Sequence, residues 1–387
     1  MDLEDKISAM TWPEDHSEDL STEGSPPLKV AVSMLTLVPG GMGGSETYAR
    51  QLLESLGTSP STKATAYVSS FAENFTAAVP EVVCSEVSGG KTNVARIKTL
   101  VQSFIHRGRL LKRMRGSDVF HVPFTVPLPK PSRRLPFVQT LLDMQHMDLP
   151  DLFTPFDKVY RKFYYDRAAK KADVVVTISE FAKQSIIDHL GIAPEKIFVA
   201  HLGVDAAEFT PNLGSRERFI LYPARGWKHK NHAKLFEAMR ILQTTNPDLR
   251  LILTGGALET LTDVPSNVEV RGLVSLAELR ELYRQAACMV FPSLYEGFGL
   301  PPLEAMASGC PVASSTSGSL PEIVGNAAVT FDPLKPQDIA AAILQAIDST
   351  EELQAAGLEQ VNKFTWAHCA EVHEQAYRYA YRSRNQI

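Results

Sequence analysis

"SLYEGFGLPPLEAMASGCPV", the stretch from Ser293 to Val312, decides the fold of this chain. It begins at the end of a short apolar run, "CMVFPS", which is typical of a strand buried on both faces in a parallel sheet. Pro301 suits the first position of a helix, because its missing N–H would be unpaired there anyway. The stretch therefore predicts a strand, a Gly-rich loop and a helix, with Glu296 and Glu304 beyond the strand's carboxyl end.

Strands alternate with helices in the same way on both sides of this stretch. Apolar runs predict strands at Leu28–Leu35, Ala64–Ser70, Ser117–Pro123, Pro136–Asp143, Ala172–Ser179, Arg218–Ala224, Leu249–Gly256 and Cys288–Ser293. Helical patterns lie at Glu46–Leu56, Glu180–Leu190 (with Ser179 as N-cap), Asn231–Leu242 and Leu276–Ala286. This alternation predicts an α/β protein of two facing Rossmann-like domains, each a doubly wound parallel sheet, with the ligand cleft between them.

The loop-like segment "AAEFTPNLGSRER" separates the two series of elements. We therefore expect an N-terminal domain over 28–207, a C-terminal domain over 208–364, and a last helix within 365–387 that packs back on the N-terminal domain. Residues 1–27 hold eight acids against one base and few apolar residues, which predicts a disordered acidic tail.

Composition excludes several classes of protein. No apolar run approaches the roughly 20 residues that span a bilayer, and the N-terminus lacks a basic-then-apolar secretion signal. The four cysteines are scattered without CxxC spacing, which argues against a zinc site or a disulfide framework and for a reducing compartment. We expect a cytoplasmic protein.

The two glutamates lie where a nucleotide could bind. Glu304, expected in the first helical turn, could accept hydrogen bonds from two adjacent hydroxyls, as on a ribose. The free N–H groups of Gly299 and Leu300, with the helix dipole, suit a phosphate, and Glu296 lies in the loop where it can face the cleft. The alternative is that Glu304 only complements the dipole and Glu296 is solvated.

A second candidate loop, "YPARGWKHKNH", follows another predicted strand. Arg225 offers a planar fork of donors and Lys230 a point charge, so the pair could hold a diphosphate. Cations placed there would stabilise the charge that develops on a departing diphosphate. A solvated basic loop is the alternative interpretation.

The first half of the chain contributes two weaker signals. "PGGMGGSE", with Gly43 and Gly44, lets backbone approach a ligand closely, or is only a tight turn. It is not a dinucleotide fingerprint, because Glu46 stands where the last glycine would be needed. In "TLLDMQHMDLPDLF", Asp143 and His146 follow a strand, and His146 could contact substrate or handle a proton, or be structural.

Residues 91–117 hold eight Lys or Arg and no acid, with apolar residues between them. Such a basic amphipathic helix can lie on an anionic membrane surface. A solvated helix face or a subunit contact are the alternatives. Nucleic acid is not expected as a partner, because aromatic stacking motifs are lacking. The oligomeric state is left open.

Taken in order, these features resemble the family 4 retaining glycosyltransferases, which have the two-domain GT-B architecture. The most specific part is E-x7-E, "EGFGLPPLE"; "GGMGGSE", "SEFAKQSI", "LGVDAAEF", "HKNH" and "SGSLPEIVGNAAVTFDP" support it, so the resemblance runs from about Leu28 to the end. One departure is Leu142, which stands where many members have a histidine before the aspartate.

The resemblance implies roles for the candidate residues. Glu304 would bind ribose, Glu296 the transferred sugar, and Arg225 and Lys230 the diphosphate. The backbone of Gly297, Phe298, Gly299 and Leu300 would contact phosphate or sugar, and the loop of Gly43 and Gly44 would close over the donor.

The implied reaction is transfer of a hexosyl group, mannosyl by the closest branch, with retention at the anomeric carbon. The donor would be a nucleoside diphosphate sugar, GDP-mannose first, and the acceptor a glycan or a lipid-linked glycan. No metal and no cofactor are expected, since Arg225 and Lys230 would do a metal's electrostatic work. A non-catalytic nucleotide-sugar-binding subunit and another GT-B enzyme, such as a nucleotide-sugar epimerase, remain open.

Overall fold

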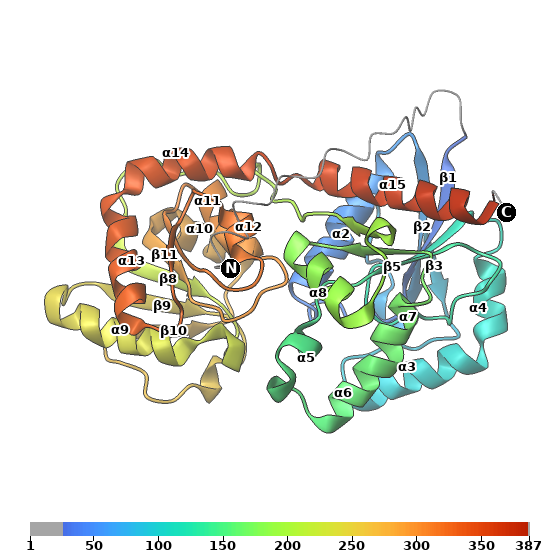
Figure 1. Cartoon of the computed structure of the whole chain (residues 1–387), viewed down its shortest axis with the longest axis horizontal. Coiled ribbons are helices and arrows are strands. Elements are labelled where there is room, and N and C mark those ends of the chain that lie inside the picture. Colours follow the sequence, from blue (N-terminus) through green and yellow to red (C-terminus); the bar gives the residue numbers. More distant parts are fainter. Residues whose placement is uncertain (1–25, 386–387) are drawn as a thin grey trace.

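The structure is a computed structural model, and it describes residues 26–385. The acidic tail predicted over 1–27 falls, except for its last two residues, outside that range. The described chain forms two parallel sheets, each in its own domain, and Figure 1 shows them side by side.

The N-terminal sheet has seven parallel strands in the order β3-β2-β1-β4-β5-β6-β7. Its strands are β1 (Leu28–Met34), β2 (Thr62–Ser69), β3 (Glu81–Cys84), β4 (Val119–Val122), β5 (Phe137–Thr140), β6 (Val174–Thr177) and β7 (Ile197–Val199). Its main helices are α2 (Gly44–Gly57), α3 (Asn93–Ile105), α4 (Arg107–Arg113), α5 (Gln145–Asp148), α6 (Pro155–Arg161), α7 (Arg167–Ala169) and α8 (Glu180–Leu190). Short helical turns are η1 (Ser70–Ala72), η2 (Pro150–Leu152), η3 (Lys162–Asp166) and η4 (Pro194–Lys196).

The C-terminal sheet has six parallel strands in the order β10-β9-β8-β11-β12-β13. Its strands are β8 (Glu217–Pro223), β9 (Arg250–Thr254), β10 (Val268–Gly272), β11 (Ala286–Phe291), β12 (Val312–Ser315) and β13 (Val329–Phe331). Its helices are α9 (His232–Thr245), α10 (Leu276–Gln285), α11 (Leu300–Ala307), α12 (Leu320–Val324), α13 (Pro336–Asp348) and α14 (Thr350–Val361), with short turns η5 (Lys228–Lys230) and η6 (Leu258–Thr260).

The central strands are buried on both faces, as continuous apolar runs predict. All residues of β4, β5, β6 and β12 are buried. Several predicted strands run too far toward their carboxyl ends: the run to Asp143, for example, leaves the sheet after Thr140. The remaining residues of that run form a loop that contacts Gly297 of the C-terminal domain, and a pattern of apolar residues does not distinguish such a loop from a strand.

The last helix, α15 (Trp366–Asn385), lies along the N-terminal domain, where it contacts α2 and β6 (Figure 1). A buried polar network fastens it there. The Tyr377 hydroxyl lies 2.9 Å from Nδ1 of His121, and Nε2 of His121 lies 2.9 Å from the Thr140 hydroxyl. The Tyr48 hydroxyl lies 2.7 Å from Nε2 of His373. Burial lowers the pKa of His373 to about 4, so this ring is neutral at pH 7.

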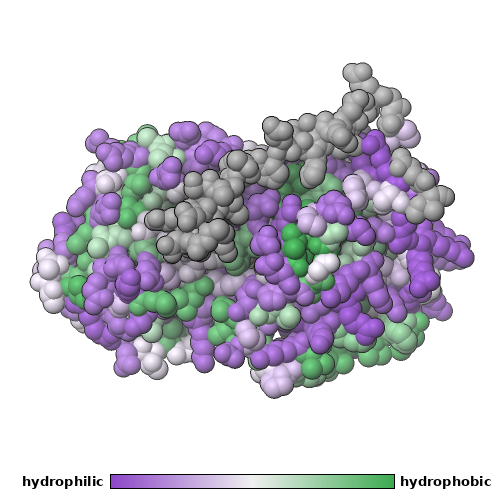
Figure 2. Space-filling model, in the orientation of Figure 1, coloured by the Kyte–Doolittle hydropathy of each residue, from purple (hydrophilic) through white to green (hydrophobic). Residues whose placement is uncertain are grey.

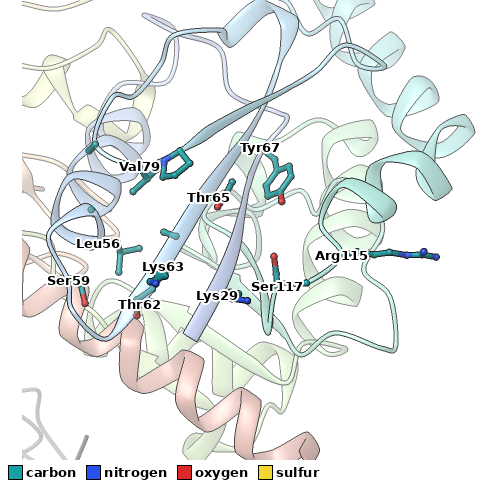
Figure 3. A pocket seen from close by; sticks show the side chains of 15 residues that line it. Lys29, Leu56, Ser59, Thr62, Lys63, Thr65, Tyr67, Val79, Arg115 and Ser117 are labelled. Atoms are coloured by element: carbon teal, nitrogen blue, oxygen red, sulfur yellow. The ribbon is translucent and has the colours of Figure 1, made fainter. Parts of the chain in front are cut away.

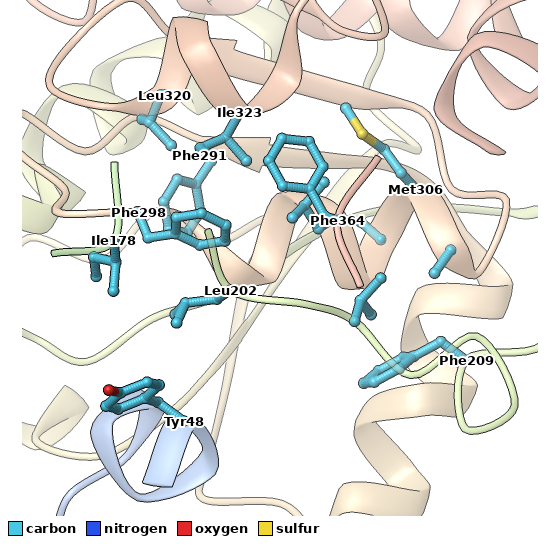
Figure 4. Close-up of a cluster of buried hydrophobic side chains, with 14 of the residues drawn as sticks. Tyr48, Ile178, Leu202, Phe209, Phe291, Phe298, Met306, Leu320, Ile323 and Phe364 are labelled. Atoms are coloured by element: carbon cyan, nitrogen blue, oxygen red, sulfur yellow. The ribbon is translucent and has the colours of Figure 1, made fainter. Parts of the chain in front are cut away.

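A hydrophobic cluster joins the two domains where the chain crosses between them. Leu202, Phe209 and Phe364 come from the two crossing segments, and Phe298 comes from the loop after β11 (Figure 4). The rings of Phe298 and Phe364 have centroids 5.9 Å apart in an edge-on arrangement. Among the helices of residues 26–385, none is long and apolar enough to cross a membrane.

Candidate active site

The candidate residues meet at the points where the strand order of each sheet reverses. In the C-terminal sheet, β8 and β11 are neighbours although β9 and β10 lie between them in sequence, so their loops emerge side by side. Leu294 donates a backbone hydrogen bond of 2.7 Å to the carbonyl of His229, and Asn231 donates from its side chain to the carbonyl of Pro292. The loop with Arg225 and Lys230 is thereby fixed to the loop with Glu296.

Lys230 and Glu296 form an ion pair across these two loops. Lys230 Nζ lies 2.5 Å from Oε1 of Glu296, and both side chains are 14% exposed. The Tyr222 hydroxyl donates to the carbonyl of Lys230 and holds the backbone from which the ammonium projects. The structure thus brings together one cation and one carboxylate that the sequence places 66 residues apart.

Arg225 is a half-buried cation with no salt bridge or hydrogen bond to its guanidinium among residues 26–385. The guanidinium lies 5.1 Å from the ring centre of Trp227, a cation–π contact. A Cβ built on Gly43 would lie 3.7 Å from Nη2 of Arg225, so the glycine loop of the first domain passes directly over it. Arg225 is therefore a preorganised cation that faces both domains.

The backbone of Glu296–Phe298 is turned so that its N–H groups are available. The carbonyls of these residues accept, in order, from the Ser319 N–H (3.2 Å), the Ser179 hydroxyl (2.8 Å) and the Ser319 hydroxyl (2.5 Å). Because a trans peptide directs its N–H opposite to its C=O, the N–H groups of residues 297–299 point away from these serines. None of the three donates to an acceptor within the described part of the chain.

Helix α11 begins one residue earlier than its sequence suggests. Leu300 is its first residue and Pro301 its second, so Glu304 lies past the first turn, and the expected position of both is wrong. The cause is Gly299, whose φ of 122° lets it end the loop as N-cap. A Cβ at Gly299 would lie 2.8 Å from Cδ2 of Leu320, so the Leu320 side chain would have to move, and the positive φ would strain any other residue.

Glu304 is a partly buried carboxyl that accepts a 3.0 Å hydrogen bond from the Tyr283 hydroxyl. Burial raises its pKa to about 7, and the Tyr283 hydrogen bond and the charge of Arg280 oppose that rise. The group is thus poised between its neutral and ionised forms near neutral pH.

The first domain reaches the same place with Gly44 and Asp143. A Cβ on Gly44 would lie 3.8 Å from the side chain of Leu300. A Cβ on Gly297 would lie 3.1 Å from Cβ of Asp143, so the two loops are in contact. Burial raises the pKa of Asp143, and the nearby charge of Glu296 adds to the rise.

His146 has a different setting from the other candidates. It is buried, with Nε2 3.0 Å from Oδ1 of Asp166, between the rings of Phe153 and Tyr165. Nδ1 of His146 has no hydrogen-bond partner among the described residues. Asp143 and the carbonyl of Leu142 contact Gly297 of the Glu296 loop, and Asp148 accepts a 2.8 Å hydrogen bond from the hydroxyl of Tyr295 in that loop. The role of His146 toward substrate stays a prediction.

The two domains are joined beside the site at the N-terminus of α8. Glu322, from α12 of the C-terminal domain, accepts from the N–H groups of Glu180 (2.8 Å) and Phe181 (3.2 Å). His201 Nε2 lies 2.6 Å from the same carboxylate. Ser179 caps this helix with its hydroxyl oxygen while it donates to Gly297, as above. A carboxylate at a helix N-terminus is favourable, so this contact stabilises the arrangement of the two domains.

Sequence reasoning identified Ser179 only as a helix cap and missed Glu322. The available signal for Glu322 was its position in "SGSLPEIVG", directly after a late strand of the same sheet. Its hydrogen-bond donors come from a helix 142 residues away in sequence, so no local sequence pattern could predict the contact.

A separate hollow of about 580 Å³ lies beside the amino ends of β1 and β2 in the N-terminal sheet (Figure 3). Lys29 and Lys63 stand at the amino ends of β1 and β2, and Arg115 and Ser117 precede β4. Ligands of doubly wound sheets bind beyond the carboxyl ends, so this open hollow is not the candidate site.

Comparison with known proteins assigns both halves of the chain to one group. Residues 205–359 match the family described as "Glycosyl transferases group 1", and residues 42–208 match "Glycosyltransferase Family 4". O-antigen chain mannosyltransferase B of Escherichia coli is 32% identical over 266 residues, which is 62% of this chain and 70% of that protein. The MMP alpha-(1->4)-mannosyltransferase of Mycolicibacterium hassiacum is 32% identical over 219 residues, 52% of each chain.

Solved structures show the same fold at low sequence identity. Sucrose-phosphate synthase from Thermosynechococcus elongatus superposes with a TM-score of 0.73 at 19% identity, over 91% of this chain and 98% of that one. The Anabaena protein HepE, in complex with UDP and glucose, gives 0.65 at 17% identity over 89% and 97%. WaaG, a glycosyltransferase involved in lipopolysaccharide biosynthesis, gives 0.66 at 14% identity over 89% and 98%. The chain therefore belongs to glycosyltransferase family 4, with the two Rossmann-like domains of the GT-B architecture.

Proposed function

We propose that this glycosyltransferase moves a hexosyl group, mannosyl in the first instance, from a nucleoside diphosphate sugar to a hydroxyl of a glycan or lipid-linked acceptor, with retention at the anomeric carbon. The observation that carries the proposal is the meeting of two cations, a carboxylate and three free N–H groups at one switch point. This donor set suits a diphosphate joined to a sugar.

The site offers each part of such a donor its own partner. Glu304 would accept from the ribose hydroxyls, and the N–H groups around Phe298–Leu300, at the start of α11, would donate to a phosphate. The Phe298 side chain is buried in the interdomain cluster, so only its backbone is available. Arg225 and Lys230 would bind the diphosphate, while Gly43 and Gly44 cover it from the first domain.

The Lys230–Glu296 ion pair indicates how the transfer would be assisted. Lys230 would lie between the sugar-orienting carboxylate and the leaving diphosphate, so its charge stabilises the negative charge that develops as the C1–O bond breaks. The acceptor oxygen would bond to C1 on the same face, and its proton would pass to the departing phosphate oxygen. Glu296 is engaged by Lys230, which fits a binding role better than that of a nucleophile.

The choice of mannose and of a metal-free mechanism has separate support. The mannosyl proposal rests on the two relatives named above, and GDP-mannose is its donor; HepE, which binds UDP, makes a uridine donor the competing choice. Metal independence rests on Arg225 and Lys230, which supply the positive charge that a divalent cation would otherwise provide. No cofactor takes part in the proposed reaction.

A transfer assay with labelled GDP-mannose and UDP-glucose tests the proposal. We expect transfer or slow hydrolysis by the wild type, and a loss of about 10²–10³ in kcat for Lys230→Ala, the usual effect of removing a group that stabilises transition-state charge. Lys234→Ala is the matched control, because Lys234 lies on the exposed face of α9 and pairs only with Glu237 within the described residues.

Binding measurements separate the alternatives. Thermal stabilisation by a nucleoside diphosphate without any turnover would point to the non-catalytic binding subunit, and conversion of the sugar without transfer to an epimerase. A ligand at 100 times its Kd adds about 2.7 kcal/mol to the unfolding free energy, so the screen is sensitive enough to rank the bases.

A further inference from the structure

Helix α3 presents most of its large apolar side chains to solvent and buries two hydroxyl residues against the protein. Thr99 and Ser103 are its buried residues, and the Ser103 hydroxyl has no partner among the described residues. Leu100 packs against the core, but the other five large apolar side chains of α3 are between 51% and 78% exposed: Val94, Ile97, Val101, Phe104 and Ile105. Surface helices of globular proteins place their apolar stripe toward the core, so this helix has the opposite orientation.

A second exposed apolar group lies on the helical run formed by α6 and η3. Phe156, Val159 and Phe163 are between 55% and 75% exposed. This run lies beside α3: burial raises the pKa of Tyr160 on α6 to about 12, and the nearby charge of Arg96 on α3 opposes that rise. Figure 2 shows hydrophobic side chains along the lower edge of the molecule, where Figure 1 places α3 and α6.

Basic residues surround these apolar groups. Residues 91–117 carry eight bases without an acid, and of these Arg113 alone forms an ion pair within residues 26–385, with Glu86. Residues 155–171 add six bases against two acids, one of which, Asp166, is buried against His146. The exposed surface is therefore apolar and strongly positive.

The combination of exposed apolar side chains and positive charge indicates which kind of partner this surface binds. Exposed apolar area of this extent marks an interaction site. A nucleic acid would pair with the bases but leave the aliphatic side chains in water, and a second copy would bring the same positive charge against this one. An anionic bilayer satisfies both features, because it has negative headgroups above a hydrocarbon layer.

We propose that α3 and α6–η3 form a membrane-docking surface, the α3–α6 surface, composed of the eight exposed apolar residues named above and the bases around them, and that its partner is an anionic lipid bilayer. The apolar side chains insert below the headgroups while Lys98, Arg109 and their neighbours stay among the lipid phosphates.

The docking surface is continuous with the candidate site through the chain itself. The segment from Asp143, which contacts the Glu296 loop, leads through α5 and η2 directly into α6. A docked molecule would thus hold the N-terminal edge of its cleft close to the bilayer. If the proposed transfer is correct, a lipid-linked acceptor reaches the cleft along this segment.

Sedimentation with lipid vesicles tests the proposal. The full chain should bind vesicles of phosphatidylglycerol and phosphatidylcholine at low salt, bind phosphatidylcholine alone far more weakly, and be released as salt rises. The variant Ile97→Ser/Val101→Ser/Phe104→Ser should bind at least tenfold more weakly. These positions are exposed, so circular dichroism should show an unchanged fold. Lys98→Gln and Arg109→Gln should each weaken binding about fivefold.

Leu273→Ser/Leu334→Ser is the matched control, since both leucines are exposed on the C-terminal domain, away from α3. The proposal is overturned if the wild type ignores anionic vesicles, if the triple variant binds them as well as the wild type, or if the triple variant only converts a dimer to a monomer. Hydrolysis of nucleotide sugar in solution should be the same in the triple variant, so failure here is distinguishable from failure of the proposed transferase function.

Discussion

We predict that affinity for the nucleotide sugar depends on pH through the ionisation of Glu304. Two adjacent ribose hydroxyls can donate to both oxygens of Glu304 at once only when the carboxyl is ionised, whereas the pKa of the free group is about 7. At pH 6 about nine-tenths of the free protein would carry a proton on Glu304, and at pH 8 about one-tenth. Binding of both hydroxyls requires loss of that proton, so affinity should rise by up to about tenfold between pH 6 and pH 8 and level off above.

Isothermal titration with an intact nucleoside diphosphate sugar, in the absence of acceptor, measures this rise. Both phosphates of such a donor are esterified and keep a constant charge over this range. His229 and His232, which flank Lys230, have pKa values lowered to about 4 by burial and so do not titrate there. Buffers of different ionisation heat should also reveal about half a proton released per ligand at pH 7.

Two variants decide the interpretation. Glu304→Gln should bind more weakly but with a flat pH profile. Tyr283→Phe should shift the rise to higher pH, because the lost hydrogen bond is one that lowers the Glu304 pKa. A flat profile for the wild type, or the same slope in Glu304→Gln, would refute the reasoning.

Three further outcomes follow from contacts outside the donor site. Glu322→Gln should raise KM and lower kcat together, because it weakens the joint at α8, and small-angle scattering should show a more open molecule; unchanged kinetics would contradict this. Tyr377→Phe should cost about 1–3 kcal/mol in urea unfolding, because it leaves His121 Nδ1 unpaired in the core, whereas Tyr381→Phe, at an exposed position, should cost little. His373, whose pKa is lowered to about 4, takes up a proton more readily when unfolded, so stability should fall as pH drops from about 6.5 toward 4. His373→Phe should make that fall shallower, and His229 and His232, whose pKa values are also lowered to about 4, should contribute to what remains.

The order of strands and helices was readable from the sequence because the parallel strands are continuous apolar runs. Helix α8 illustrates this best: its predicted range, Glu180–Leu190, and its Ser179 cap are confirmed. Boundaries near the cleft were less predictable. The start of α11 depends on the left-handed backbone of Gly299, and the chain after Thr140 is apolar but leaves the sheet to form the site loop.

The site was predictable where a loop directly follows a strand, and not where the contact crosses domains. Arg225, Lys230 and Glu296 were identified because parallel strands bring their carboxyl ends to one edge. The ion pair between Lys230 and Glu296, the contact of Asp143 with Gly297 and the joint at Glu322 depend on the relative position of distant segments. The sequence also did not show that most large apolar side chains of α3 are exposed, because its composition equally fits a helix whose apolar side chains are buried.

The most direct test of the proposed mechanism follows the anomeric proton of the sugar by NMR during transfer in EDTA, with wild type and Lys230→Ala in parallel. The account predicts that the wild type forms the retained anomer without any divalent cation, and that Lys230→Ala forms it at least about 100-fold more slowly. An inverted product, a requirement for Mg²⁺ or Mn²⁺, or equal rates for the two proteins would contradict it.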